Sequence, residues 1–144
     1  RKVLDIKLTG SFLMSQAVIP AIAGHGDGGS ILNISSIAGK KGNANMAAYC
    51  TSNFGIQGFT QALAMELAGQ NIRVNAVCPG IIDTSRMDDL GRESTWTKTI
   101  QQLIPLDRAG TDDEIGKFVS YLCTPEASYI TGQSINMDGG VVMW

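Results

Sequence analysis

Three short apolar stretches, separated by longer segments with helical spacing, constrain the fold of this chain most strongly. The stretches are 31-ILNI-34, 72-IRVNAV-77 and 133-QSINM-137. The segments between them repeat apolar residues every three or four positions, which is typical of amphipathic helices. Strands that alternate with helices form right-handed crossovers and a parallel sheet. The chain is therefore predicted to be an α/β protein that contains part of a doubly wound parallel sheet.

Two long helical segments accompany these strands. Residues 1 to about 23 carry apolar residues at a spacing of four, and Pro20 is expected to kink or fray the end of this helix. Residues 46–69 form the second helix, which carries one apolar stripe. Gly55 and Gly58 in that helix are small enough to let another element approach closely.

Two local motifs mark where elements begin and end. The cluster 24-GHGDGG-29 follows a helix and precedes a strand. A dinucleotide-binding loop needs the opposite order, so that a helix N-terminus faces the phosphates, and the cluster is interpreted as a turn. The stretch 111-TDDE-114 is a capping box, which predicts that a helix begins there.

A long mixed segment separates the second strand from that capping box. Residues 81 to about 105 show no clear period, although short helices are expected within them. Loops of this length inside a compact domain are usually functional and often act as lids. The apolar side chains of this segment indicate a partly apolar pocket and are Met87, Leu90, Trp96 and Ile100.

Composition excludes several classes of protein. With 144 residues, 44% apolar and 17% charged, the chain fits one ordinary globular domain. The formal net charge of −2 gives no basic surface for nucleic acid or for an anionic membrane, so neither partner is expected. No apolar run approaches the roughly 18–20 residues that a membrane span requires.

Cysteine and histidine usage points to a reduced compartment and to no metal. Cys50, Cys78 and Cys123 are widely separated and form no CxxC pair, which is typical of reduced thiols in a cytoplasmic protein. His25 is the single histidine and has no cluster of ligands at metal-binding spacing. A cytoplasmic location and the absence of a metal site are therefore expected.

Three polar features are predicted to meet at one edge of the sheet. Ser36 follows the first strand, Pro79 and Gly80 follow the second, and Tyr49 lies near the start of the helix between them. Ligands of such sheets bind beyond the carboxyl ends of the strands. Taken one by one, serine or Pro-Gly at a strand end also occurs as ordinary turn chemistry.

Taken together, these features resemble a known family. The stretches 32-LNISSIAG-39, 73-RVNAVCPGIIDT-84 and 130-ITGQSINMDGG-140, with Tyr49 thirteen residues after Ser36, are similar to the C-terminal half of short-chain dehydrogenases/reductases. The resemblance covers essentially the whole chain. It implies a Rossmann-type three-layer sandwich, of which residues 1–144 form the catalytic and substrate half and the N-terminal cofactor-binding half is absent.

The resemblance also implies a chemistry for individual residues. Tyr49 would be the general acid/base for a carbonyl oxygen, and Ser36 would orient that oxygen. Four residues would hold the nicotinamide end of NAD or NADP, and they are Pro79, Gly80, Ile82 and Thr84. The substrate would be a secondary alcohol or a ketone. The two long helices, together with the last helix and strand, would join copies of the chain into a dimer or tetramer.

One pair of residues departs from the family pattern. The family places Lys four residues after the tyrosine, where this chain has Asn53, and it usually places Asn where this chain has Lys7. By position, both belong to the catalytic set, and Asn53 joins Tyr49 among the cofactor contacts. A free tyrosine titrates near pH ~10 and is a poor proton donor at neutral pH unless a cation lies close by.

Two interpretations of this exchange follow. In one, the long Lys7 stem reaches into the site and restores the charge near Tyr49. In the other, Lys7 extends to water, because a buried ammonium is costly, and the site is impaired. Accordingly, the chain is either an NAD(P)-dependent oxidoreductase or a non-catalytic structural or regulatory partner that keeps the oligomerisation surfaces.

Overall fold

The computed structural model describes residues 1–84 and 94–144, with only the backbone described for Ser94, Thr95, Trp96 and Thr99. Its helices are α1 (Lys2–Leu4), the π-helical turn η1 (Asp5–Thr9), α2 (Gly10–Gly24), α3 (Ala47–Leu67), α5 (Ser94–Leu103) and α6 (Asp112–Cys123), with short 3-10 turns η2 (Ile37–Gly39), η3 (Ala68–Gln70) and η4 (Pro125–Ala127). Its strands are β1 (Gly29–Ile34), β2 (Ile72–Pro79), β3 (Ile82–Asp83), β4 (Gly110–Thr111) and β5 (Ser134–Met137).

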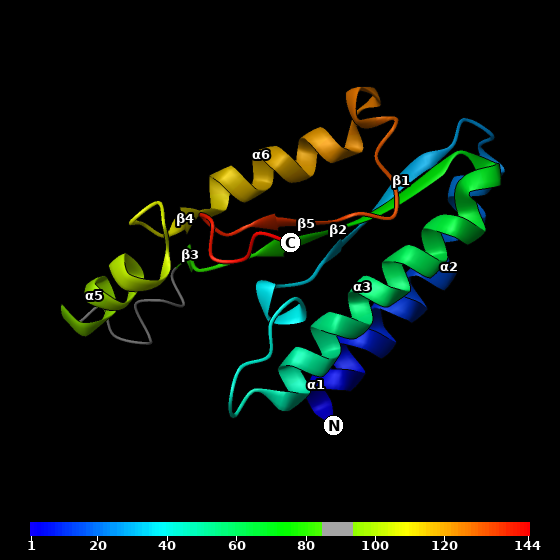
Figure 1. The fold of residues 1–144 in the computed structure, drawn as a ribbon. Helices are drawn as coiled ribbons and strands as arrows, with labels where there is room; N and C mark the ends of the chain where they lie inside the picture. Colours follow the sequence, from blue (N-terminus) through cyan, green and yellow to red (C-terminus); the bar gives the residue numbers. More distant parts are fainter. Residues whose placement is uncertain (85–93) are drawn as a thin grey trace.

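The predicted parallel sheet is confirmed. Strands β1, β2 and β5 lie side by side in that order, all parallel, with Gly29 opposite Ile72 and Ala76 opposite Ser134. Helices α2 and α3 cover one face and α6 covers the other, which gives three layers (Figure 1). A second, two-stranded sheet in which β3 pairs with β4 was not predicted.

A hydrophobic core fills the space on each face of the sheet. On the α3 side the buried residues are Leu63, Ala64, Leu67, Ile72 and Val74. On the α6 side they are Val77, Leu122 and Ala127. Successive residues of β2 therefore supply the two cores alternately, as the period of a strand buried on both faces requires.

The first long helix has nearly its predicted bounds and one departure from α geometry. It runs from Lys2 to Gly24, close to the predicted end near residue 23, and Pro20 lies within its last turns. Its departure from α geometry lies near the N-terminus, where Asp5–Thr9 form a π-helical turn. Strand β2 extends beyond its prediction, because it ends at Pro79 rather than before Cys78.

This helix also corrects the expectation about membrane spans. Within the described residues, Lys2–Gly24 is long and apolar enough to cross a bilayer by length and composition alone, with a mean hydropathy of 1.3. The sequence from Leu8 to Gly24 has no charged residue, and scattered Ser, Thr and Gly break its apolar run without lowering the average much. Ile19 and Ile22 pack against the core on the α3 side, whereas only 6% of the stretch is buried.

Candidate active site

Ser36, Tyr49 and the Pro79–Gly80 turn all lie at the carboxyl edge of the sheet. Ser36 is the second residue after β1, Tyr49 is in the first turn of α3, and Pro79 ends β2. The amide of Ser35 donates to the carbonyl of Val77 at 2.8 Å, which keeps the chain beside β2 up to the serine. The Tyr49 side chain is half-buried rather than enclosed in the core.

Ser36 caps the short turn η2. Its Oγ accepts a hydrogen bond from the Ala38 amide at 3.2 Å. This bond uses the oxygen as an acceptor and leaves the hydroxyl proton available to a second partner. Within residues 1–84 and 94–144, the Tyr49 hydroxyl has no hydrogen-bond partner. The two hydroxyls can therefore both donate to a ligand.

Close packing fixes α3 against this edge. Ser35 Oγ donates to the Asn53 carbonyl at 3.1 Å. A Cβ on Gly39 would lie 2.7 Å from the carbonyl carbon of Asn53 and 2.8 Å from its oxygen, so only glycine fits between η2 and the helix. The turn after Ser36 and the helix that carries Tyr49 are consequently held in contact.

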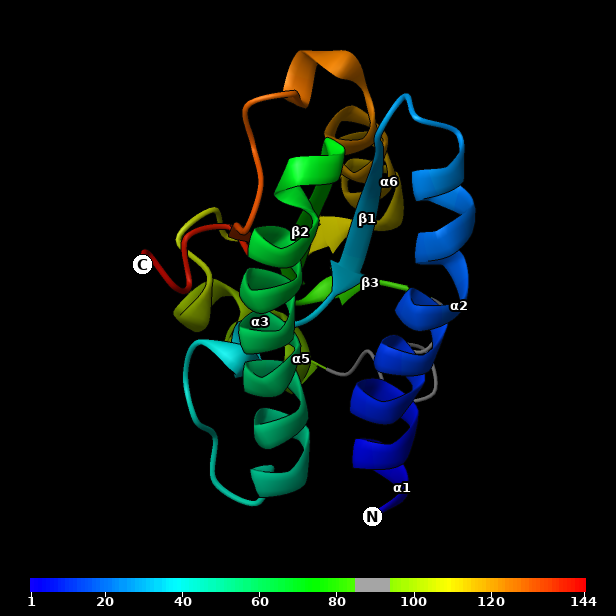
Figure 2. The ribbon, with the colours of Figure 1, turned by 90° about the vertical axis from the view of Figure 1, so that its right-hand side faces the viewer.

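A second close approach brings the first helix to α3. A Cβ on Gly55 would lie 2.6 Å from Cδ2 of Leu8, which confirms that this glycine admits another element. The same prediction is wrong for Gly58, because the space beside it is open. Figure 2 shows α1 beside the first turns of α3. Next to Leu8, the π-helical turn carries Lys7, whose carbonyl accepts from Ser11 Oγ at 2.7 Å.

The Lys7 ammonium points into the site. Its Nζ donates to Asn53 Oδ1, lies 3.4 Å from the Ser35 carbonyl oxygen, and sits 5.0 Å from the centroid of the Tyr49 ring. A distance below about 6 Å from an aromatic face is a cation–π contact. The structure therefore places the charge against the tyrosine rather than out in water.

Asn53 is wholly enclosed by these contacts. Its side chain is 0% exposed. Its Nδ2 donates to the Tyr49 carbonyl at 2.8 Å, one turn earlier in α3, while its Oδ1 accepts from Lys7. Both ends of the amide therefore have partners within the protein, and the amide oxygen holds the ammonium in place.

No carboxylate neutralises this ammonium among the described residues. The ion pairs found there join Arg1 to Asp5, Arg108 to Glu114 and Lys117 to Asp113. Burial lowers the pKa of Lys7 below its ordinary value, and the nearby Tyr49 and Cys78 oppose that shift. Burial also raises the pKa of the Cys78 thiol, which a hydrogen bond with Ser35 partly offsets.

The predicted nicotinamide contacts surround the end of β2. Gly80 donates its amide to the Met137 carbonyl at 3.0 Å, and a Cβ on Gly80 would lie 2.7 Å from Cβ of Asp138. Ile82 lies in β3 opposite Gly110, and Thr84 is the last residue described before the gap. We call Pro79, Gly80, Ile82 and Thr84 the rim. Within it, Pro79 and Gly80 are held to β5, and Ile82 is held to β4.

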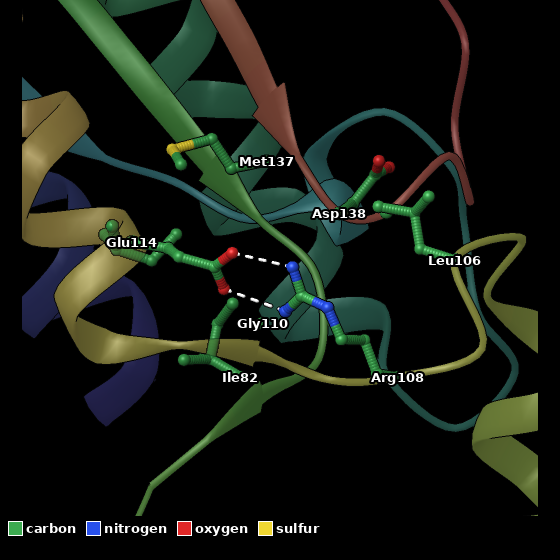
Figure 3. A pocket seen from close by; sticks show the side chains of 9 residues that line it. Ile82, Leu106, Arg108, Gly110, Glu114, Met137 and Asp138 are labelled. Carbon is green, nitrogen blue, oxygen red and sulfur yellow. Dashed lines mark hydrogen bonds and ion pairs between the residues drawn. The ribbon is translucent and has the colours of Figure 1, made fainter.

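A cavity of about 170 Å³ lies beside that rim (Figure 3). Ile82 contributes to its wall, and across it Arg108 makes a bidentate pair with Glu114, at 2.9 and 2.7 Å. The sequence predicted Glu114 only as part of the capping box, which the structure confirms. The partnership with Arg108 was missed, since a spacing of six residues is not a helical neighbour relation.

The predicted lid is covered only in part. Met87 and Leu90 fall in residues 85–93, outside the described residues, and only the backbone of Trp96 is described. The segment after them forms α5, in which Ile100 is buried. The described ranges contain no group of three or more histidine, cysteine or acidic residues able to hold a metal ion.

The parallel sheet, with Ser36 and Tyr49 at its carboxyl edge, points to a class of protein. The chain belongs to the short-chain dehydrogenase/reductase family, and a family model described as Enoyl-(Acyl carrier protein) reductase matches residues 1–142. It is 43% identical over 143 residues to a 3-oxoacyl-[acyl-carrier-protein] reductase of Synechocystis sp., an alignment that covers 99% of this chain and 56% of that protein. A human (3R)-3-hydroxyacyl-CoA dehydrogenase is 37% identical, with 99% and 54% covered.

Solved structures agree with this assignment. A 4-hydroxyisoleucine dehydrogenase complexed with NADH superposes with a TM-score of 0.92 at 32% identity, covering 96% of this chain and 57% of that one. An acetoin dehydrogenase from Enterobacter cloacae gives 0.85 at 36% identity, with 98% and 54% covered. The chain thus spans little more than half the length of the relatives it matches.

Proposed function

We propose that this chain is the catalytic half of an NAD(P)-dependent oxidoreductase that interconverts a secondary alcohol and a ketone. The observation that carries the proposal is the Lys7 ammonium, 5.0 Å from the centroid of the Tyr49 ring, in a site that otherwise offers two hydroxyls at the carboxyl edge of a parallel sheet. Relatives that are named as reductases and dehydrogenases over the matched region support it.

In this proposal, each residue has one task during ketone reduction. The Ser36 hydroxyl donates a hydrogen bond to the ketone oxygen and orients it. The Tyr49 hydroxyl transfers its proton to that oxygen as the carbon accepts a hydride, and the Lys7 ammonium stabilises the phenolate that remains. In the reverse direction, the phenolate takes the proton from the alcohol.

The residues fit the nicotinamide end of a dinucleotide better than they fit its ribose. When bound, the reduced nicotinamide supplies the hydride. Pro79, Gly80, Ile82 and Thr84 form the rim that would receive its carboxamide. The proposed contact of Asn53 with the ribose has less support, because both ends of its amide are already engaged within the protein.

A chimera tests the proposal. This chain would be joined to the N-terminal part of the Synechocystis relative, and consumption of NADH or NADPH would be followed with a panel of small ketones. We expect ketone-dependent consumption that Tyr49→Phe lowers by about 10²–10⁴-fold, the usual contribution of a general acid. If Tyr49→Phe turns over as fast as the starting chimera, the assigned chemistry is wrong.

We further propose that copies of the chain associate into a homo-oligomer. The outer faces of the two long helices expose large apolar side chains, which a monomer rarely leaves uncovered in number. They are Phe12 (54%), Leu13 (55%), Phe54 (48%) and Met65 (83%). Light scattering of the eluted chimera should give a dimer or larger, and Met65→Glu should shift it toward monomer. Association without any turnover would favour the non-catalytic partner over the enzyme.

A further inference from the structure

Lys7 and Asn53 lie 46 residues apart in the chain and touch in a region where two glycines allow close packing against α3. Gly55 admits the first helix, and Gly39 admits the turn that follows Ser36. The contact joins an ammonium donor to an amide oxygen. If lysine and asparagine exchanged positions, the contact would still join one ammonium to one amide oxygen.

We infer that Lys7 and Asn53 work as one reciprocal pair, in which Lys7 is the positioning residue that supplies the positive charge to Tyr49 and Asn53 is the seat that holds it there. The inference rests on the proposed function and adds to it the role of Asn53, which holds the ammonium in place, and the exchangeability of the two residues. It decides between the two interpretations of the sequence in favour of charge replacement.

The surroundings of the ammonium support this role. Its contacts are neutral oxygens, namely Asn53 Oδ1 and the Ser35 carbonyl, and the titratable side chains that act on it are Tyr49 on α3 and Cys78 on β2. Lys40 acts in turn on Cys78. With no carboxylate among these groups, the charge is not cancelled locally, so its field reaches the tyrosine ring.

The pair predicts non-additive effects of mutation. Lys7→Asn alone leaves two amides and no cation. Asn53→Lys alone places two ammoniums in one half-buried space, where like charges disfavour each other. The double variant again contains one ammonium and one amide. Each single change should lower turnover of the chimera about 100-fold, and the double variant should recover to within about tenfold of the start.

A pH profile separates charge from packing. Because the pKa of Lys7 is lowered, the ammonium is present at low pH and is lost as pH rises through that pKa. Ketone reduction should therefore fall on the alkaline side in the starting chimera. Lys7→Arg should keep its charge and move that fall to higher pH, while Lys7→Met, of similar stem length, should be slow at every pH.

The pairing and the enzyme proposal can fail separately. Single variants that stay as active as the start, or a double variant that shows the product of both losses, would overturn the pairing. If no chimera consumes reduced nicotinamide with any ketone, the enzyme proposal fails instead. The pairing is then judged from thermal unfolding of the 144-residue chain with the same four combinations, where additive changes in stability would refute it.

Discussion

Two cations at the carboxyl edge of this sheet have opposite surroundings. Lys7 is half-buried, contacts neutral oxygens and an aromatic ring, and has a lowered pKa because of burial. Arg108 is exposed, is held bidentately by Glu114, and has a raised pKa because of that partner. The charge of Arg108 is neutralised by Glu114, and the pair forms part of the cavity wall. The charge of Lys7 is left uncancelled, which makes it the one suited to act on a reaction.

Removing each cation in turn gives the largest expected contrast. Lys7→Met in the chimera should reduce kcat for ketone reduction by about 10²–10³-fold, within the range of general acid catalysis. Arg108→Met is the matched control and should change kcat by no more than about fivefold, because the exposed Arg108 charge is paired with Glu114 and does not face the Tyr49 ring. Equal losses in the two variants would show that the surroundings do not distinguish the cations.

A methyl group added at Gly39 should disturb the packing around Asn53, the residue that contacts Lys7. The added Cβ would meet the backbone of Asn53, which cannot swing aside as a side chain can. We expect Gly39→Ala to lower the free energy of unfolding by about 1–3 kcal/mol, as overpacking does. Chemical denaturation measures this value, and an unchanged midpoint would contradict the close contact between η2 and α3.

Two glycines of α3 differ in what lies beside them, so alanine substitutions at both test how closely the first helix packs there. Gly58 faces open space, so Gly58→Ala should stabilise the chain by about 1 kcal/mol through helix propensity. Gly55→Ala gains the same propensity but pushes against Leu8, next to Lys7, and should gain less or nothing. Thermal unfolding of both variants compares them directly. Equal gains in stability would mean that Leu8 and the first helix can move away from the added methyl group at no cost in free energy.

The capping box at the start of α6 lies beside the Arg108–Glu114 pair, so a change there tests the second cation of the comparison. Thr111 accepts from the Glu114 amide at 3.2 Å at the start of α6. Thr111→Ala should cost about 1 kcal/mol of stability, the typical value of an N-cap. Turnover per folded chimera should stay the same, in contrast to the variants around Lys7. A large loss of turnover in Thr111→Ala would show that the Arg108–Glu114 region takes part in the reaction, contrary to this expectation.

The smallest effect expected is a pH dependence of stability. The pKa of Glu114 is lowered to about 2, first by its hydrogen bond with Arg108. A carboxyl with a lowered pKa stabilises the fold above its ordinary value of 4.5, and the stabilisation is lost as pH falls from there toward about 2. Glu114→Gln should flatten that part of the stability curve. An unchanged slope in the variant would show that the exposed pair is not formed.

Local patterns predicted the elements well because their causes are local. The apolar runs that became β1, β2 and β5, the turn with positive φ at Gly26 and Gly28, and the capping box all follow from neighbouring residues. The end of the first long helix near residue 23 was predicted within one residue, and Pro20 lies inside its last turns. The π-helical turn at Asp5–Thr9 and the pairing of β3 with β4 have no sequence signal of their own.

The candidate site divides in the same way. Ser36, Tyr49 and Pro79 could be placed at one edge from the alternation of strands and helices, since parallel strands end together. The direction of Lys7 could not be predicted, because a long flexible side chain is directed by what packs around its stem. Arg108 was missed for a related reason, as its partner is set by the path of the chain between β3 and α6.

By itself, the amino-acid sequence determined that the chain forms a parallel α/β sheet, which residues end at its carboxyl edge, and that Lys and Asn stand exchanged relative to the family pattern. Only the tertiary structure decided that the exchanged residues touch. That outcome depends on the close approach of the first helix to α3 beside Gly55, which the packing of distant segments determines. Burial then decides how strongly the ammonium acts, because an uncancelled charge is effective only where water does not screen it.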